Sequence, residues 1–506
     1  MNIKQAKEYI KSSVRLYLKK DEFGEYQVPV VRQRPIFLLG APGIGKTASM
    51  EQIAQEMGLA LVAYSMTHHT RQSALGLPFI TQKKYGDKEY QVSEYTMSEI
   101  IASVYDTMEN SGIKEGILFL DEINCVSETL APSMLQFLQY KVFGRHQVPE
   151  GWVIVTAGNP PEFNKSVREF DVVTMDRLKL LEVEADYETW KEYARERQIH
   201  NGIMTYLELK KDHFYVMEMT TKGRSYVTAR GWEDLSEMLY LYEQEGLEVE
   251  ESLIGQYLHN DKVIREFAAY YELYQKYKRD YKVAEILQGN ASERAYERAK
   301  AAGFDERLSL LGMLVESIQA DMKNVMDRMK VLQELKAPLK KMSECQDSEE
   351  LSSTLVKMIE GRQKAYASLQ AANSLSDDEK KKHRSIIAFL EECRKTDLSG
   401  DGVELSGDGD TGFAVLKEKY NSSVKELQKD TEQVKVKLHH LFTFVEKAFG
   451  EGNEMLILVT ELTVGASSAG FIGAFGSEDY AHYSKEMMLN ERQQDIKEKL
   501  DALDVE

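Results

Sequence analysis

The chain has 506 residues, of which 42% are apolar, and its formal net charge is −19. That length exceeds what one ordinary hydrophobic core supports, so we expect about two to four domains. The acidic balance argues against a broad nucleic-acid-binding face, because phosphate contacts require clustered Lys and Arg, although a local basic patch remains compatible with it.

Other general features indicate a cytoplasmic protein. Residues 1–5 begin no apolar segment of the kind found in secretory signals. The three cysteines are odd in number and widely scattered, which suits reduced thiols better than a disulfide framework. The apolar run at residues 455–459 is followed by Glu461 and several glycines, so we expect a buried helix and a glycine-rich turn there, and no membrane span.

The first part of the chain predicts a helix, a strand, a glycine-rich loop and a second helix. An apolar stripe at helical spacing covers residues 2–20. After a polar connector, residues 35–39 have the length and composition of a strand. The loop at residues 40–47 reads Gly-Ala-Pro-Gly-Ile-Gly-Lys-Thr, and residues 48–57 read as a helix.

The loop at residues 40–47 has the spacing of a polyphosphate-binding loop, in which two glycines precede Lys and Ser or Thr. Its backbone N–H groups would surround phosphates at a helix N-terminus. We expect Lys46 to reach the β- and γ-phosphates of ATP and the Thr47 hydroxyl to bind Mg²⁺. A chance glycine loop is the alternative, which the flanking strand and helix disfavour. The other residues expected to contact the nucleotide are Gly40, Ala41, Pro42, Gly43, Ile44, Gly45 and Ala48.

Residues 59–65 predict a second strand, which is followed by His68 and His69. These adjacent histidines do not predict a metal site, because neighbouring side chains on a strand point to opposite faces and no third ligand lies nearby. Weak alternation around a turn at residues 85–88 predicts a hairpin within residues 73–95.

Three further apolar runs, at residues 116–120, 152–157 and 178–183, complete a predicted set of five strands. Helical segments at residues 96–110 and 127–140 separate them. Strands that alternate with helices indicate an α/β fold with a parallel sheet covered on both faces.

Polar side chains follow two of these strands. Asp121 and Glu122 end the strand at residues 116–120, and Asn159 follows the next one. Because ligands bind at the carboxyl edge of open parallel sheets, we expect Asp121 to hold Mg²⁺ and Glu122 to polarise the attacking water. Asn159 would orient that water, with a turn-forming Asn before proline as the alternative. Asn124 is a weaker candidate for a related role.

Two arginines are candidates for stabilising the charge that spreads over a transferred phosphoryl group. Arg177 precedes the fifth strand, and Arg230 starts a helix farther along the chain. Arg168 competes with Arg177 for the first role. By chemistry alone, an arginine at position 177 or 230 is more often a salt-bridged surface group.

The remainder of the chain is predicted to be helical, and we divide the whole by residue number. Apolar residues that step by three and four from Leu308 to Leu332 predict a long helix, with Pro338 and residues 345–347 marking its end. Acidic residues at 401–410 lack the spacing of a calcium loop. The expected parts are an α/β nucleotide-binding domain (1–185), a helical lid (186–280), a long-helix region (281–395), a flexible linker (396–412) and a C-terminal helical region (413–506).

Taken in order, the glycine loop, the acidic pair, Asn159, Arg177 and Arg230 resemble the motifs of AAA+ ATPases. The hairpin before the Asp-Glu strand and the segment Met-Asp-Arg-Leu at residues 175–178 are similar to features of the MoxR branch. The resemblance covers residues 34–274. Two departures are a lid motif without the usual Ser-Pro before Arg230, and Leu178 in place of Phe.

The resemblance implies roles and partners. Asn159 would be sensor 1, Arg177 an arginine finger that acts on a neighbouring subunit, and Arg230 sensor 2 on the lid. It further implies a homo-oligomeric ring, usually a hexamer, with chaperone-like remodelling of a protein client and often a partner that carries a von Willebrand A domain. The rivals are a nucleotide-gated scaffold that binds partners through its long helices and, less favoured by the acidic charge, a nucleic-acid motor.

Overall fold

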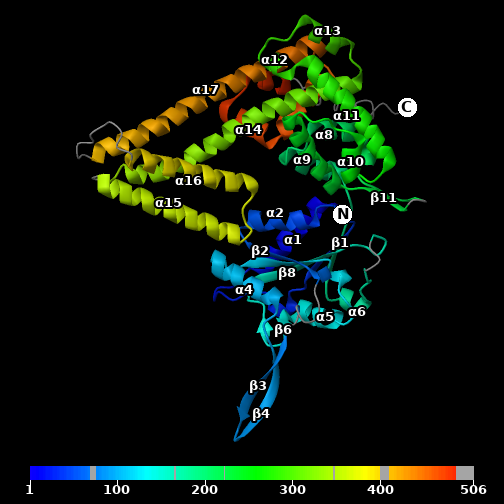
Figure 1. Cartoon of the computed structure of the whole chain (residues 1–506), viewed down its shortest axis with the longest axis vertical. Coiled ribbons are helices and arrows are strands. Elements are labelled where there is room, and N and C mark those ends of the chain that lie inside the picture. Colours follow the sequence, from blue (N-terminus) through cyan, green and yellow to red (C-terminus); the bar gives the residue numbers. More distant parts are fainter. Residues whose placement is uncertain are drawn as a thin grey trace, which may run out of the picture. The chain divides into compact units, whose positions relative to one another are not determined.

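The computed structural model describes residues 1–68, 74, 76–163, 167–220, 223–345, 348–398 and 409–485. These residues divide into two compact units. The first unit combines Met1–Thr189, Thr228–Arg230 and Ile359–Ile387. The second contains Trp190–Val227, Gly231–Met358 and the described part of Ala388–Glu506. Figure 1 labels many of the elements of both units.

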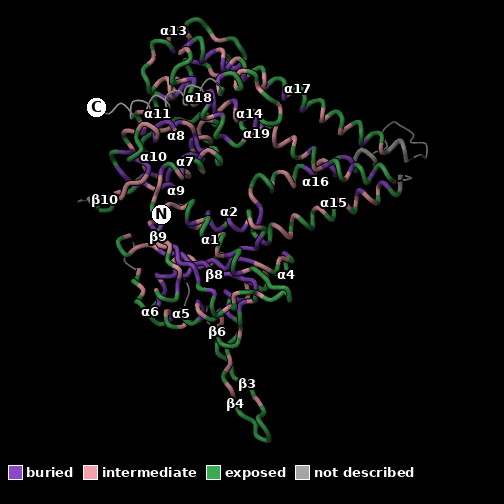
Figure 2. Tube along the Cα trace, turned by 180° about the vertical axis from the view of Figure 1, so that it is seen from behind, coloured by how far each residue is buried: buried purple, intermediate pink, exposed green. Residues whose placement is uncertain are grey.

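A five-stranded parallel sheet forms the centre of the first unit, in the order β2-β5-β8-β1-β9. The five predicted strands are therefore all present, and the predicted α/β class is confirmed. All residues of β8 are buried, as expected for a sheet covered on both faces (Figure 2). The strands are β1 (Ile36–Gly40), β2 (Ala60–Ser65), β5 (Gly116–Asp121), β8 (Trp152–Gly158) and β9 (Lys179–Val183).

Between Ile3 and Met175, the described residues include five helices that accompany this sheet. The first begins with a capping box, in which Asn2 accepts from the backbone N–H of Gln5 and the Gln5 side chain accepts from that of Asn2. It buries Ala6, Ile10 and Val14, the stripe read from the sequence. The helices are α1 (Ile3–Tyr17), α2 (Lys46–Met57), α4 (Glu99–Ser111), α5 (Ala131–Tyr140) and α6 (Val172–Met175).

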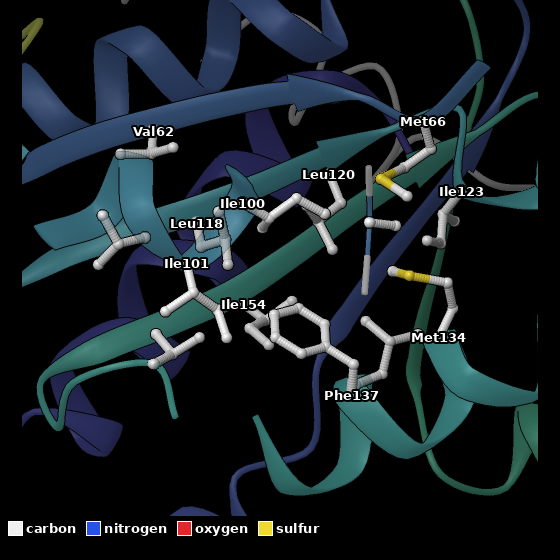
Figure 3. Packing of buried hydrophobic residues seen from close by; sticks show 14 of the residues in the cluster. Val62, Met66, Ile100, Ile101, Leu118, Leu120, Ile123, Met134, Phe137 and Ile154 are labelled. Atoms are coloured by element: carbon white, nitrogen blue, oxygen red, sulfur yellow. The ribbon is translucent and has the colours of Figure 1, made fainter. Parts of the chain in front are cut away.

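One hydrophobic cluster fills the space between the sheet and helices α4 and α5 (Figure 3). Leu118 and Leu120 of β5 and Ile154 of β8 meet Ile101 of α4 and Phe137 of α5 within it. The motif residues at the ends of β5 and β8 therefore continue from strands whose inner residues are held in a packed core.

Two hairpins interrupt the alternation of strands and helices. The predicted hairpin is present as β3 (Pro78–Tyr85) and β4 (Lys88–Tyr95), which pair antiparallel. A second, unpredicted hairpin pairs β6 (Val142–Phe143) with β7 (His146–Gln147). Of the two adjacent histidines, His69 lies outside the described residues.

The edge strand β2 is capped by a distant turn between α15 (Ser348–Ala371) and α16 (Asp377–Leu398). The backbone N–H of Leu61 donates to the carbonyl of Ala372 at 3.0 Å. The Ser368 hydroxyl donates to the carbonyl of Ser111. This turn belongs to the first unit, and covering a sheet edge in this way removes an exposed row of backbone groups.

The second unit is mainly helical. Helix α14 packs along α17, and the pair is tied by ion pairs such as Lys437 with Asp321 at 2.6 Å. A hairpin of β10 (Val216–Thr220) and β11 (Gly223–Val227) lies in a region expected to be mostly helical. The helices that lie in or enter this unit, besides α15 and α16, are α7 (Tyr187–Glu196), α8 (Asn201–Leu209), α9 (Ala229–Glu245), α10 (Glu251–Tyr257), α11 (Asp261–Tyr281), α12 (Val283–Leu287), α13 (Glu293–Ala301), α14 (Phe304–Met342), α17 (Gly409–Phe449), α18 (Asn453–Val464) and α19 (Ala466–Phe475).

The helical region corrects two expectations. Pro338 does not end the long helix, because α14 continues through it to Met342. The expected glycine-rich turn after residues 455–459 is instead the helix α19, which contains Gly470 and Gly473. Of the predicted linker at 396–412, the described flanks are helical, and residues 399–408 lie outside the described residues.

No single helix in the described ranges is both long and apolar enough to cross a membrane. Helices α18 and α19, which meet at a bend of 86°, pass the same test of length and composition only as a pair.

Candidate active site

The glycine loop joins the carboxyl end of β1 to the first turn of α2, as the sequence predicts. Gly43 has a positive φ of 75°, a conformation that side chains disfavour. A Cβ at Gly43 would also lie 2.8 Å from the Cβ of Thr228, one residue before α9. This glycine is therefore required both by its backbone conformation and by the close approach of Thr228.

Lys46, the first residue of α2, lies buried among oxygen acceptors. Its ammonium donates to the carbonyls of Gly40 at 2.7 Å and Ala41 at 2.8 Å, and to Oδ1 of Asn159 at 2.9 Å. Burial lowers the pKa of Lys46 to about 8. The carboxylates of Asp121 and Glu122 oppose this shift, and the nearby charge of Arg230 adds to it. The predicted lysine and amide are thus in direct contact.

Thr47 and Asp121 meet across the ends of α2 and β5. The Thr47 hydroxyl donates to Oδ2 of Asp121 at 3.0 Å, while Oδ1 accepts the backbone N–H of Glu122 at 2.8 Å. A hydroxyl beside a carboxylate is a donor set that suits Mg²⁺, which binds through one or two protein oxygens together with substrate phosphates. The residues present therefore fit the predicted metal.

Glu122 has a left-handed backbone, with φ 54° and ψ 38°, which is uncommon for a residue with a side chain. Such strained residues concentrate at functional sites. Its Oε2 accepts from the hydroxyl of Ser65 at 3.3 Å. Sequence reasoning missed Ser65, although this residue ends β2 and lies opposite Asp121 in the parallel register. The order of the strands in the sheet, which places β2 beside β5, is needed to predict the contact of Ser65 with Glu122.

Asn159 directly follows β8, and its backbone is held from the neighbouring strand end. Asn124, in the short 3₁₀ helix Ile123–Cys125, donates its Nδ2 to the carbonyl of Asn159 at 2.8 Å. Both asparagines are therefore at the site, but their side chains have different contacts. Asn159 faces Lys46, whereas Asn124 faces the backbone behind it.

The three candidate arginines separate in space. Arg230, in the first turn of α9, is exposed and lies near enough to influence the pKa of Lys46. Arg177 is exposed just after α6, and its backbone N–H donates to the carbonyl of Thr174. Among the described residues, no hydrogen bond or ion pair joins Arg177 to the loop or the acidic pair. Arg168 pairs with Glu128 at 2.8 Å.

A cation, a hydroxyl, two carboxylates and an amide thus converge at the carboxyl edge of one parallel sheet. This arrangement can bind a triphosphate along the loop and orient a water toward its terminal phosphorus. Its chemistry is positional and electrostatic, because phosphoryl transfer to water requires little covalent participation by the protein. Fold and site together define a P-loop ATP hydrolase with an AAA+ core.

Comparison with known families specifies the domain. Residues 35–178 match the family model described as AAA domain (dynein-related subfamily), a segment that runs from just before β1 to the residue before β9. These residues therefore form an AAA domain, which confirms the predicted class of enzyme, an ATP hydrolase, and implies that it binds ATP. A search of curated proteins found no match to this chain.

Proposed function

We propose that this protein is a ring-forming AAA+ ATPase of the MoxR branch that couples ATP hydrolysis to remodelling or activation of a protein client. The dynein-related subfamily includes the MoxR-like ATPases. The observation that carries the hydrolytic part is the contact of Thr47 with Asp121 beside the contact of Lys46 with Asn159. The nucleotide-binding domain would comprise residues 1–185, and the helical lid, which carries Arg230, residues 186–280. The regions 281–395, 396–412 and 413–506 would be accessory parts, and the protein would act in the cytoplasm.

Each site residue has a distinct task in the proposed cycle. Lys46 and the loop backbone hold the phosphates, and Arg230 contacts the γ-phosphate from the first turn of α9. Thr47 and Asp121 would hold Mg²⁺, which supplies neutralisation of the charge on the β- and γ-phosphates. Glu122 polarises the attacking water, and Asn159 orients it.

The surface around Arg177 supports the proposed ring. Val172 and Val173 of α6, which precede this arginine, are 84% and 60% exposed. Two neighbouring exposed valines beside an exposed arginine form a surface that a second subunit could cover. In the proposed ring, Arg177 reaches the ATP bound by that neighbour, where its planar guanidinium stabilises the transition state.

The hairpin β3–β4 supports contact with a protein client. Its strands and flanks expose several large apolar side chains, among them Leu77, Ile80 and Tyr85 at 57%, 73% and 57%. Such a concentration on one element marks an interaction surface. A client protein, or a partner with a von Willebrand A domain as in the resemblance to MoxR ATPases, would bind there.

Mixing two inactive variants tests the ring. Lys46→Ala removes nucleotide binding, and Arg177→Ala leaves the subunit's own nucleotide site intact. If Arg177 acts across a subunit boundary, a mixture contains interfaces with an intact site and an intact arginine, and ATPase activity recovers in part. An inert mixture, under conditions where light scattering shows mixed oligomers, would contradict the proposal.

Remodelling is tested with a permanently unfolded polypeptide such as casein as the probe. We expect it to accelerate ATP turnover, and the double substitution Ile80→Ser with Tyr85→Ser to abolish the acceleration without changing basal turnover. The rival is a nucleotide-gated scaffold, which the long helices α14 and α17 favour. Tight ATP binding with negligible, probe-insensitive turnover would support that rival.

A further inference from the structure

Asn124 lies behind the candidate active site, and the roles proposed for the other site residues do not account for its contacts. Its side chain is buried, with 4% of the residue exposed. Its Nδ2 donates to the carbonyl of Asn159, and its own carbonyl accepts the backbone N–H of Arg168 at 2.9 Å. The amide orientation is set by chemistry, since only the NH₂ group can face a carbonyl oxygen. Asn124 therefore bridges the segment after β5 and the segment after β8.

Gly158, the last residue of β8, leaves the space that the amide of Asn124 occupies. A Cβ on Gly158 would lie 2.5 Å from Oδ1 and 2.7 Å from Cγ of Asn124. The amide of Asn124 thus lies directly against the backbone of Gly158. A glycine within a strand is characteristic of such close approach. The contact depends on both residues together, because any side chain at 158 would displace the amide.

One atom of Asn124 makes this arrangement costly for stability. Its Oδ1 is buried and has no hydrogen-bond partner among the residues that the structure describes. A buried acceptor without a partner destabilises a fold, and native structures contain few of them. A leucine of similar shape would remove the unpaired acceptor, but it would also remove the hydrogen bond to the carbonyl of Asn159. Where a local rule is broken without a gain in stability, a functional constraint is the expected reason.

Asn159 is consequently fixed at two points. Its side-chain Oδ1 accepts from Lys46, and its backbone carbonyl accepts from Asn124. We propose that Asn124 is a positioning residue for ATP hydrolysis: it fixes the backbone of Asn159, so that the Asn159 amide faces the attacking water. This inference rests on the proposed role of Asn159 in the cycle. The inference predicts that substitution of Asn124 lowers kcat and leaves nucleotide affinity nearly unchanged.

A double-mutant cycle in the full chain tests the inference. We expect Asn124→Leu to lower kcat by roughly 10-fold, as loss of supporting contacts around a site does, and to leave KM within about two-fold. Its melting temperature should stay close to that of the wild type, because loss of the hydrogen bond to the Asn159 carbonyl is offset by removal of the unpaired Oδ1 acceptor. The double variant with Asn159→Ala should have the kcat of Asn159→Ala alone, because Asn124 acts through Asn159.

Gly158→Ala offers an independent approach, since its methyl group displaces the amide of Asn124, and we expect the same fall in kcat. Asn110→Ala, on the exposed face of α4, is the matched control and should behave as wild type.

Wild-type kcat in Asn124→Leu, or effects of the two substitutions on kcat that multiply in the double variant, would overturn the inference. If Glu122→Gln hydrolyses ATP normally, the proposed function fails; if it is inactive while Asn124→Leu is normal, only this inference fails.

Discussion

The two ends of the parallel sheet in the first unit are held by different means. At the carboxyl ends, side chains of Thr47, Asp121 and Asn159 contact one another or the lysine of the loop. At the amino ends and the β2 edge, the contacts combine backbone groups with the buried side chain of Lys141. Leu61 donates to Ala372, and the buried ammonium of Lys141 donates to the carbonyl of Trp152 at 2.6 Å and to Oε1 of Gln33 at 2.7 Å.

The carboxyl end of the sheet therefore serves the proposed chemistry, and the amino end serves the stability of the fold. The carboxyl end carries acidic and strained residues, such as Glu122, that gain nothing for packing. At the opposite end, the buried ammonium of Lys141 and the backbone N–H of Leu61 are paired with protein acceptors. Substitutions at the first end should therefore change turnover, and those at the second should change the free energy of unfolding.

The largest expected effect is on turnover. Glu122→Gln removes the carboxylate that polarises water and should lower kcat by roughly 10³-fold, the range of general-base contributions. ATP affinity, measured by equilibrium binding, and the melting temperature should change little, because Glu122 is only partly buried. Glu109→Gln, on the exposed face of α4, is the control. A large drop in melting temperature with Glu122→Gln would contradict the conclusion that the carboxyl end contributes to turnover and the amino end to stability.

At the other end, Ala372→Asp should destabilise the first unit. Ala372 is fully buried in the hydrophobic cluster, and an unpaired carboxylate there would lower the free energy of unfolding by about 3–5 kcal/mol. Ala371 is exposed, so Ala371→Asp is a control that differs by one position. Chemical denaturation measures the loss, and ATP affinity of the folded protein should stay within about two-fold. Equal stability of the two variants would show that the turn does not pack on β2.

The carboxyl end could be predicted because its signals are local. The loop at residues 40–47, the pair Asp121 and Glu122, and Asn159 each follow a recognisable apolar strand, and the structure brings them together as expected. Parallel strands place all their carboxyl ends at one edge, so strand identity alone was enough. Ser65 ends the predicted second strand, but only the order of the strands, which places β2 beside β5, shows that it lies next to Asp121.

The amino end had no comparable signal. The contact of Leu61 with Ala372 joins residues some three hundred positions apart, through a backbone bond that any residue could make. Pro338 was misread for a related reason: proline disfavours a helix interior, but tertiary packing of α14 outweighs local propensity. The hairpin β10–β11 was likewise hidden within a region of otherwise helical pattern.

Lys141 tests the amino end through pH. Burial lowers the pKa of Lys141 to about 8, whereas the unfolded chain keeps a value near 10.5. Between these values the unfolded state binds more protons, so this group makes stability rise with pH from about 8 to 10.5. The unfolding free energy of the wild type, relative to that of Lys141→Met, should therefore rise by roughly 3 kcal/mol over that window.

Denaturation at pH 7.5, 9 and 10.5 measures this difference for both proteins. Lys114→Met, at an exposed position before β5, serves as the control and should leave the profile parallel to that of the wild type. Parallel profiles for wild type and Lys141→Met would mean that the buried ammonium keeps its ordinary pKa. In that case its two hydrogen bonds offset the cost of burial completely.

The smallest expected effect concerns Ser65, whose hydroxyl contacts Glu122 at 3.3 Å. This long, exposed hydrogen bond to a carboxylate contributes about 1 kcal/mol at most. Ser65→Ala should therefore lower kcat by about three- to five-fold, because the carboxylate loses one orienting contact, with stability unchanged. Single-turnover hydrolysis with saturating ATP measures the step, and Ser93→Ala in β4 is an exposed control. A rise in kcat would instead mean that Ser65 holds Glu122 away from the water, so that β2 restrains the chemistry at its carboxyl end.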